Sequence, residues 1–307
     1  MSRKFISLQR ALQVSLLLVV IGLLGYLIYK KSESFSFLTD EVKDQERFVF
    51  LTKKQACELF KTDPDAYFER LNELDRYAMK LPTTEAAIQH MCKNSRSFTP
   101  REQAKMIRCC IRADQFFRSL DIPYSHSRVA ERVPYFDGNK AAEMPWKFVV
   151  TVGTSNEEGM PHTKGDFIYV SDSVVSDDEL ELTAILIHEK VHVYERKYPD
   201  LMEKWMAHSG YKRYRRQSQV ETARSNPDVD GWTYIDPLGK ETVVHYNVRL
   251  AEGFRQKRGL SKYSKLPKSI IDSTYPHNDS AATEHPYEML AYKLDKMYTD
   301  SVKNKHR

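Results

Sequence analysis

The sequence predicts an α+β fold for the larger part of the chain, preceded by one membrane-spanning helix. Helix starts followed by apolar residues at helical spacing occupy the first half of the chain. Two apolar runs typical of strands, residues 147–152 and 166–170, come after them, and a further capped helix follows the second run directly. Helices and strands that are segregated in this way, rather than alternating regularly, indicate an α+β architecture.

The composition is that of a globular protein with a mild basic excess. The 307 residues, of which 41% are apolar, supply enough core for one large or two modest domains. The 47 basic and 42 acidic residues give a formal net charge of +5, so no nucleic-acid partner is expected. The strongest basic cluster, residues 212–216 (KRYRR), is interpreted as the solvated face of a helix; contact with phosphates, anionic lipid or an acidic substrate is the alternative.

An uncharged apolar segment near the N-terminus, residues 11–29, has the length needed to cross a bilayer. Residues 1–10 are predicted to form a tail before it and residues 30–46 a polar juxtamembrane stalk after it. A cleaved signal peptide is the alternative, but the apolar run is long for one and no small-residue cleavage site precedes Lys30-Lys31. We therefore expect a single-pass protein held in the lipid bilayer, with the remainder on the lumenal or extracellular side.

Residues 47–125 are predicted to be a helical region that packs beside the following domain or covers its cleft. Asp63-Pro64 fits a helix start with proline at the first helical position, and residues 99–102 (TPRE) fit a capping box. This region contains the cysteines, which either form up to two disulfides in an oxidising compartment or remain buried free thiols. They are Cys57, Cys92, Cys109 and Cys110.

Residues 126–307 are predicted to form the second domain, and its most specific chemical signal is H-E-x-x-H at residues 188–192. In a helix, which Ser176 and Glu179 would begin with a capping box, His188 and His192 stand one turn apart on one face. Both imidazoles can then reach one ion, with Glu189 beside them. Zinc-assisted hydrolysis of a peptide bond needs two neutral nitrogen ligands, an open position for water and a carboxylate that takes the proton of that water. A chance match on a structural helix is the alternative.

The order of a strand, an edge strand and the H-E-x-x-H helix resembles the zincin metallopeptidases. The stretch 161–169 (PHTKGDFIY) occupies the place of their edge strand. An exposed strand edge beside a metal can bind an extended peptide through main-chain hydrogen bonds. His162 is then either a substrate contact or a loop histidine without a role.

The residues after His192 decide which zincins the chain resembles. Glu195 and Tyr198 stand where the metzincins carry a glycine and a third histidine, so that subclass is excluded. The stretch 284–292 (EHPYEMLAY) instead resembles the E-x-x-A segment that supplies a glutamate ligand in gluzincins, which implies Glu288 as third ligand. Tyr292 either stabilises the oxyanion or is buried with its hydroxyl bonded elsewhere. The alternative third ligands are Glu284, His285, His277, His245 and Asp200.

The resemblance implies one Zn²⁺ ion held by His188, His192 and Glu288, with Glu189 as the general base. It implies a membrane-anchored metallopeptidase acting on peptides or proteins. The alternative is an anchored binding or structural protein that has the same fold without catalysis. Either way, the long separation between His192 and Glu288 requires an insertion folded between the two helices.

Overall fold

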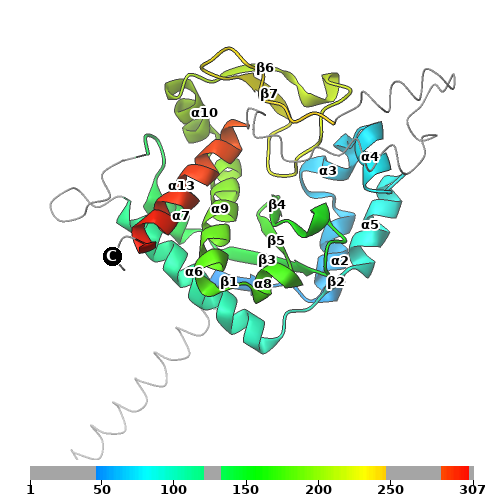
Figure 1. Ribbon diagram of the computed structural model, residues 1–307. Coiled ribbons are helices and arrows are strands. Elements are labelled where there is room, and N and C mark those ends of the chain that lie inside the picture. Colours follow the sequence, from blue (N-terminus) through cyan, green and yellow to red (C-terminus); the bar gives the residue numbers. More distant parts are fainter. Residues whose placement is uncertain (1–45, 121–132, 247–284, 304–307) are drawn as a thin grey trace, which may run out of the picture. The chain divides into compact units, whose positions relative to one another are not determined.

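A mixed α and β architecture is present, as the sequence predicts, and it includes a five-stranded sheet (Figure 1). Its strands are β1 (Phe48–Phe50), β2 (Ser95–Arg96), β3 (Trp146–Thr151), β4 (His162–Lys164) and β5 (Phe167–Ser171). The strand order is β1-β3-β5-β4, with β2 paired to β3. β3 and β5 run parallel, whereas β4 runs antiparallel to β5 and β2 antiparallel to β3. β4 is therefore a terminal strand of this sheet.

The computed structural model describes residues 46–120, 133–246 and 285–303. The predicted tail (1–10), the predicted membrane span (11–29) and all of the predicted stalk except its last residue lie outside these ranges. None of the helices within them is both long and apolar enough to span a membrane. The described residues from Val49 onward belong to one compact unit, which contains the candidate site discussed below.

Both predicted strands are confirmed to within one residue. The runs expected at 147–152 and 166–170 are β3 and β5, and nearly all of their side chains are buried. A continuous run of β-branched and aromatic residues is typical of a strand covered on both faces. β1 and β2 lie in the region predicted to be helical, so that region also contributes strands to the sheet.

The helices of the region predicted to be helical begin at both predicted places. These helices are α2 (Lys53–Lys61), η1 (Pro64–Ala66), α3 (Tyr67–Arg70), α4 (Glu73–Ala78), α5 (Thr84–Lys93) and α6 (Pro100–Ser119). Thr99 and Glu102 form the predicted capping box of α6. Asp63 and Pro64 begin η1 with proline in its first turn, as predicted, but this helix ends after three residues. The Asp63 carboxylate accepts from the main chain of Phe68 and Glu69 in α3, and Asn72 caps a separate α4.

One disulfide joins Cys57 on α2 to Cys92 on α5, which are 35 positions apart in sequence. It ties together two helices that pack on a core containing Phe60, Met91 and Tyr169. Cys109 and Cys110, on α6, are buried thiols that take no part in a disulfide. The cysteines therefore divide between the two states that the sequence left open.

The second half of the chain contains the motif helix and the helices around it. Their bounds are α7 (Gly138–Glu143), η2 (Glu157–Gly159), α8 (Asp172–Ser176), α9 (Glu179–Lys197), α10 (Pro199–His208) and α13 (Pro286–Lys303). α9 packs against α6 and α13, and α13 runs alongside it in Figure 1. The capping box predicted from Ser176 and Glu179 is wrong: Asp178 caps α9, while the Glu179 carboxylate is held by Arg108 and Arg112.

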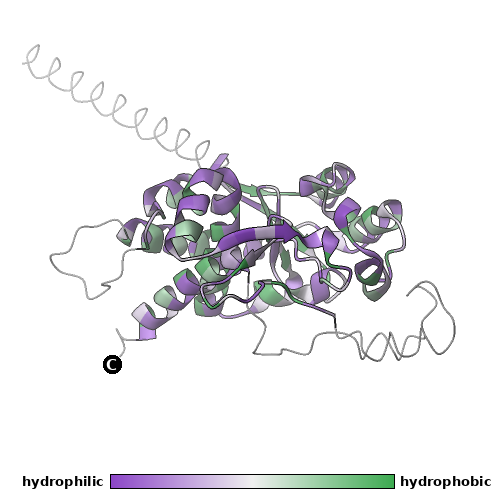
Figure 2. Ribbon diagram, turned by 90° about the horizontal axis from the view of Figure 1, so that it is seen from above, coloured by the Kyte–Doolittle hydropathy of each residue, from purple (hydrophilic) through white to green (hydrophobic). Residues whose placement is uncertain are grey.

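The basic cluster 212–216 forms a strand, β6 (Lys212–Arg216), and the predicted helix is wrong there. β6 pairs antiparallel with β7 (Trp232–Ile235), after the short turn η3 (Gln217–Gln219). The guanidinium groups of Arg213 and Arg216 lie over the Trp232 ring, so this cross-strand packing outweighs helical propensity. A hydrophilic ribbon marks the place of β6 in Figure 2, and the solvated character of the cluster is confirmed.

Candidate metal centre

The motif residues lie in the middle of α9, which is one of the most buried helices described. Acidic residues occupy its first turn and basic residues its last, so the side-chain charges complement the helix dipole. α6, α13, β4 and β5 pack around it. As a result Glu189 and His192 are buried and His188 is half-buried.

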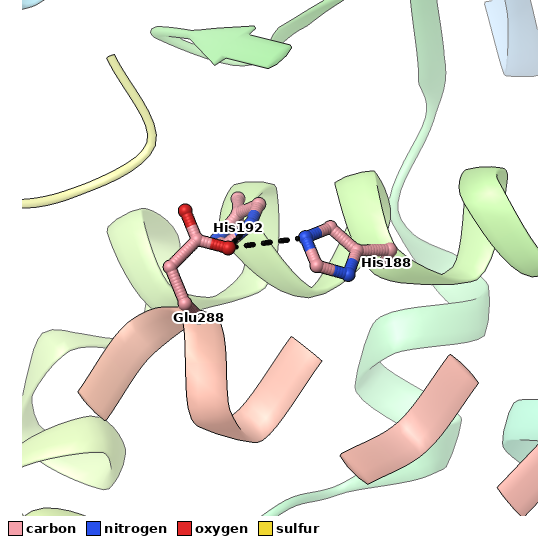
Figure 3. Close-up of side chains that lie close together, drawn as sticks. All are labelled: His188, His192 and Glu288. Carbon is pink, nitrogen blue, oxygen red and sulfur yellow. Dashed lines mark hydrogen bonds and ion pairs between the residues drawn. The ribbon is translucent and has the colours of Figure 1, made fainter. Parts of the chain in front are cut away.

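His188, His192 and Glu288 converge on one point (Figure 3). The histidines come from consecutive turns of α9, and Glu288 comes from the first turn of α13. Glu288 Oε2 lies 3.2 Å from His188 Nε2 and 3.6 Å from His192 Nε2. One ligand atom from each residue lies within 4.8 Å of the other two. The structure thus brings together the three residues predicted to hold a metal.

The two separations from Glu288 fit a tetrahedral zinc site. Ligand atoms about 2.0–2.1 Å from one ion at tetrahedral angles lie about 3.3–3.4 Å apart, which is between the two distances from Glu288. His192 Nε2 is buried and has no hydrogen-bond partner among the described residues, since 3.6 Å to Glu288 is too long for one. A buried nitrogen left without a partner is costly, and a metal ion would satisfy it.

The other ring nitrogen of each histidine contacts a carboxylate. His188 Nδ1 lies 3.0 Å from Asp295 Oδ2, and His192 Nδ1 lies 3.0 Å from Glu195 Oε2. Histidines that bind metals almost always make such a hydrogen bond, because it fixes the tautomer and turns the free nitrogen toward the ion. Glu195 occupies the position at which metzincins carry a glycine. In this chain its carboxylate instead orients the ring of His192.

Burial and neighbouring charges give the three residues different protonation states. Burial lowers the pKa of His188, but hydrogen bonds to Asp295 and Glu288 outweigh burial and raise that pKa well above its usual range. Burial lowers the pKa of His192 to about 4, against the attraction of Glu288. Burial also opposes ionisation of Glu288, yet the two histidines hold the pKa of this carboxyl well below its usual range. Without a metal, His188 therefore carries a proton and pairs with Glu288.

We expect zinc affinity to rise with pH, because a metal ion must displace the proton on His188. Below the pKa of His188, displacement of one proton changes the affinity about tenfold for each pH unit. The gain ends once pH exceeds that raised pKa. Competition with a chelator, corrected for the chelator's own protonation, measures this dependence between about pH 6 and pH 8. An affinity that is flat across this range would contradict a protonated His188.

Glu189 faces the edge strand from its place between the two histidines. Thr163 Oγ1 donates a hydrogen bond of 2.9 Å to Glu189 Oε2. Burial raises the pKa of Glu189 to about 7. A carboxylate with a pKa near neutrality suits a group that first accepts and then returns a proton.

The edge of β4 differs from the exposed edge that the sequence predicts. Only residues 162–164 form this strand, and residues 167–169 belong to the neighbouring β5. At Thr163 the main-chain N–H donates to Asp228 Oδ1 at 2.6 Å, and Arg196 Nη2 donates to the carbonyl oxygen at 3.0 Å. The main-chain groups that an extended peptide would use at Thr163 are therefore already bonded within the chain.

The structure excludes both alternatives for His162 and one of the two for Tyr292. His162 is buried in β4, stacks on Tyr169 and contacts Asn156 through Nε2, so it is neither a loop residue nor free to meet a substrate. Tyr292 is 48% exposed, so the alternative of a buried tyrosine is wrong; its ring packs edge-on against His188, beside the centre.

The alternative third ligands in the described ranges lie in other surroundings. His285 contacts the carbonyl oxygen of Trp232, His245 contacts the hydroxyl of Thr222, and Asp200 is exposed on α10. His277 and Glu284 lie outside the described residues. Among the described residues, the group able to hold a metal is His188, His192 and Glu288.

Several side chains around the centre were not singled out from the sequence. Asn226 donates to Glu288, Asp228 accepts from Thr163, and Arg196 donates to the carbonyl oxygens of His192, Thr163 and Pro227. Asn226-Pro227-Asp228 has the composition of a turn, and nothing in that pattern points to a metal site. Only the folding of this distant segment against α9 gives these residues their partners.

Comparison of the sequence with protein-family models, and of the chain with curated proteins and with solved structures, finds no match. The geometry of the centre is therefore the basis of the functional argument.

Proposed function

We propose that this chain is a membrane-anchored zinc metallopeptidase of the zincin type, resembling the gluzincins. The observation that carries the proposal is the convergence of His188, His192 and Glu288, with each imidazole held by a further carboxylate. The placement of a terminal antiparallel strand beside the H-E-x-x-H helix supports the resemblance.

In this proposal His188, His192 and Glu288 hold one Zn²⁺ ion. When bound, such an ion polarises a substrate carbonyl and lowers the pKa of water. Glu189 acts as general base and accepts the proton of the attacking water. Its Oε2 atom is engaged by Thr163, so Oε1 is the atom that takes the proton and later delivers it to the leaving amine.

The Cys57–Cys92 disulfide supports a location of this domain on the lumenal or extracellular side of the membrane. Disulfides form and persist in oxidising compartments and are rare where glutathione keeps thiols reduced. Together with the apolar segment 11–29, this favours a single-pass protein whose folded domain has been translocated.

A second candidate function is metal binding without peptide hydrolysis. The bonded edge of β4 favours it, because a peptide cannot pair with Thr163 while Asp228 and Arg196 occupy the main-chain groups there. Hydrolysis thus requires either that substrates bind without this pairing or that these contacts open.

The metal content of the purified full chain tests the proposal. We expect about one zinc per chain, and we expect Glu288→Ala to lose more affinity than the roughly 10- to 100-fold that loss of an outer partner costs. Glu203→Ala, which removes an exposed carboxylate paired with Arg213, serves as the control and should bind zinc normally. Hydrolysis of a peptide mixture then separates the two candidates: zinc without cleavage favours the binding protein, and no zinc contradicts both.

A further inference from the structure

The segment Asn226-Pro227-Asp228 lies between η3 and β7 and contacts the candidate centre at two places. Pro227 and Asp228 are buried. Asn226 donates to the carboxylate of Glu288, and Asp228 accepts from the main chain of Thr163. Since Thr163 in turn donates to Glu189, one short segment contacts both the proposed ligand and the residue that holds the proposed base.

The amide of Asn226 is fixed in one orientation. Its Oδ1 atom accepts from the main-chain N–H of Asp228 at 2.8 Å, which leaves Nδ2 to face Glu288. Nδ2 donates to Glu288 Oε1 at 2.6 Å. This arrangement is an Asx turn closed by the side chain. A flip that exchanged the oxygen and the nitrogen of the amide would therefore lose both hydrogen bonds.

The hydrogen bond from Asn226 determines which oxygen of Glu288 faces the histidines. Oε1 is held by Asn226, and Oε2 lies 3.2 Å from His188 Nε2. The terminal torsion of a glutamate is broad, so the carboxylate would otherwise rotate easily. Held in this way, Glu288 presents one oxygen to a metal and leaves a coordination position open.

The segment is itself anchored to the first half of the chain. The main-chain N–H and the hydroxyl of Ser225 both donate to Asp75, at 3.0 and 2.6 Å. The hydroxyl of Tyr246 donates to the same carboxylate, and Asn72 donates to the carbonyl oxygen of Ala223. Asp75 is fully buried on α4. Asn226 is therefore presented from a rigid support, as a residue that orients a ligand must be.

We propose that Asn226 is a positioning residue that restricts Glu288 to a single-oxygen metal contact; this inference rests on the proposed metal site. Loss of the donor frees Oε1 to contact the ion as well, which raises the coordination number and removes the position that water would occupy. Outer partners of this kind change metal affinity about 10- to 100-fold when they are removed.

Asn226→Ser in the full chain tests the proposal. A serine hydroxyl can still accept from Asp228 and keep the turn, but it is too short to reach Glu288, and it adds no charge. We expect zinc affinity, measured by chelator competition, to fall about 10- to 100-fold. We expect the visible bands of the Co²⁺-substituted protein to weaken, because these bands report coordination number.

Asn156→Ser is the matched control, because Asn156 is a buried asparagine whose Nδ2 contacts His162 and not the centre. It should lower thermal stability and leave the metal affinity and the Co²⁺ spectrum unchanged. If Asn226→Ser binds zinc as tightly as the unaltered chain and gives the same Co²⁺ spectrum, Asn226 has only a structural role. If the unaltered chain binds neither metal, the proposed centre fails and this inference fails with it.

Discussion

Replacing Glu189 with glutamine is expected to slow peptide hydrolysis severely while leaving zinc bound. Glutamine has nearly the same shape and can keep the contact with Thr163, but it cannot accept the proton of an attacking water. General-base catalysis contributes about 10²- to 10⁴-fold, so kcat should fall by that factor. His188, His192 and Glu288 remain in place, so the zinc content of the purified variant should equal that of the unaltered chain.

Glu181→Gln provides the control for this substitution. It makes the same chemical change on the same helix, but Glu181 is exposed in the first turn of α9, away from the motif. Its activity should stay close to that of the unaltered chain. Full activity of Glu189→Gln with zinc bound would contradict the proposed mechanism, whereas loss of zinc would indicate that Glu189 supports the structure of the centre.

Removing the disulfide with Cys57→Ala and Cys92→Ala is expected to lower the free energy of unfolding by about 4 kcal/mol. The link closes a loop of 35 residues, and its main effect is to restrict the unfolded chain. The loop contains α3 and α4, including the buried Asp75 that anchors the segment around Asn226. Urea unfolding of the purified full chain, followed by tryptophan fluorescence, measures the change.

Two comparisons separate the disulfide from ordinary packing. Cys109→Ala removes one buried free thiol and should cost only about 1 kcal/mol, comparable with other losses of a single buried heavy atom. Treating the unaltered chain with a reductant should lower its stability toward that of the double variant. If reductant has no effect on the unaltered chain, Cys57 and Cys92 are not linked and the argument for an oxidising compartment fails.

The sequence predicted the parts of the fold that depend on neighbours along the chain. β3 and β5 are mostly apolar runs rich in β-branched and aromatic residues, and the Thr99 capping box needs only residues three positions apart. The predictions of local structure were wrong where a residue far along the chain bound a side chain that the local pattern assigned to another role. Arg108 and Arg112, on another helix, hold Glu179, so Asp178 rather than Ser176 caps α9. Trp232 similarly stabilises 212–216 as a strand.

The residues of the candidate site also divide into those that local sequence predicts and those that only long-range packing brings together. His188 and His192 share one face because any α-helix places residues four apart together, and Glu189 follows His188 directly, so the motif could be recognised without coordinates. Glu288 is 100 positions from His188, and the packing of α13 on α9 is what brings them to 3.2 Å. A resemblance pointed to Glu288, but spacing alone could not choose it over His285 or Asp200.

By itself the sequence determined the mixed α and β architecture, the two strands leading to the motif and the helix that presents two imidazoles, because each depends on periodicity or on contacts within a turn. Only the tertiary structure decided that Asp295 holds His188, that Asn226 faces Glu288 and that the main chain of Thr163 is already bonded. These are contacts between segments tens of residues apart, and their geometry arises from the packing of whole helices and strands, which local patterns do not encode.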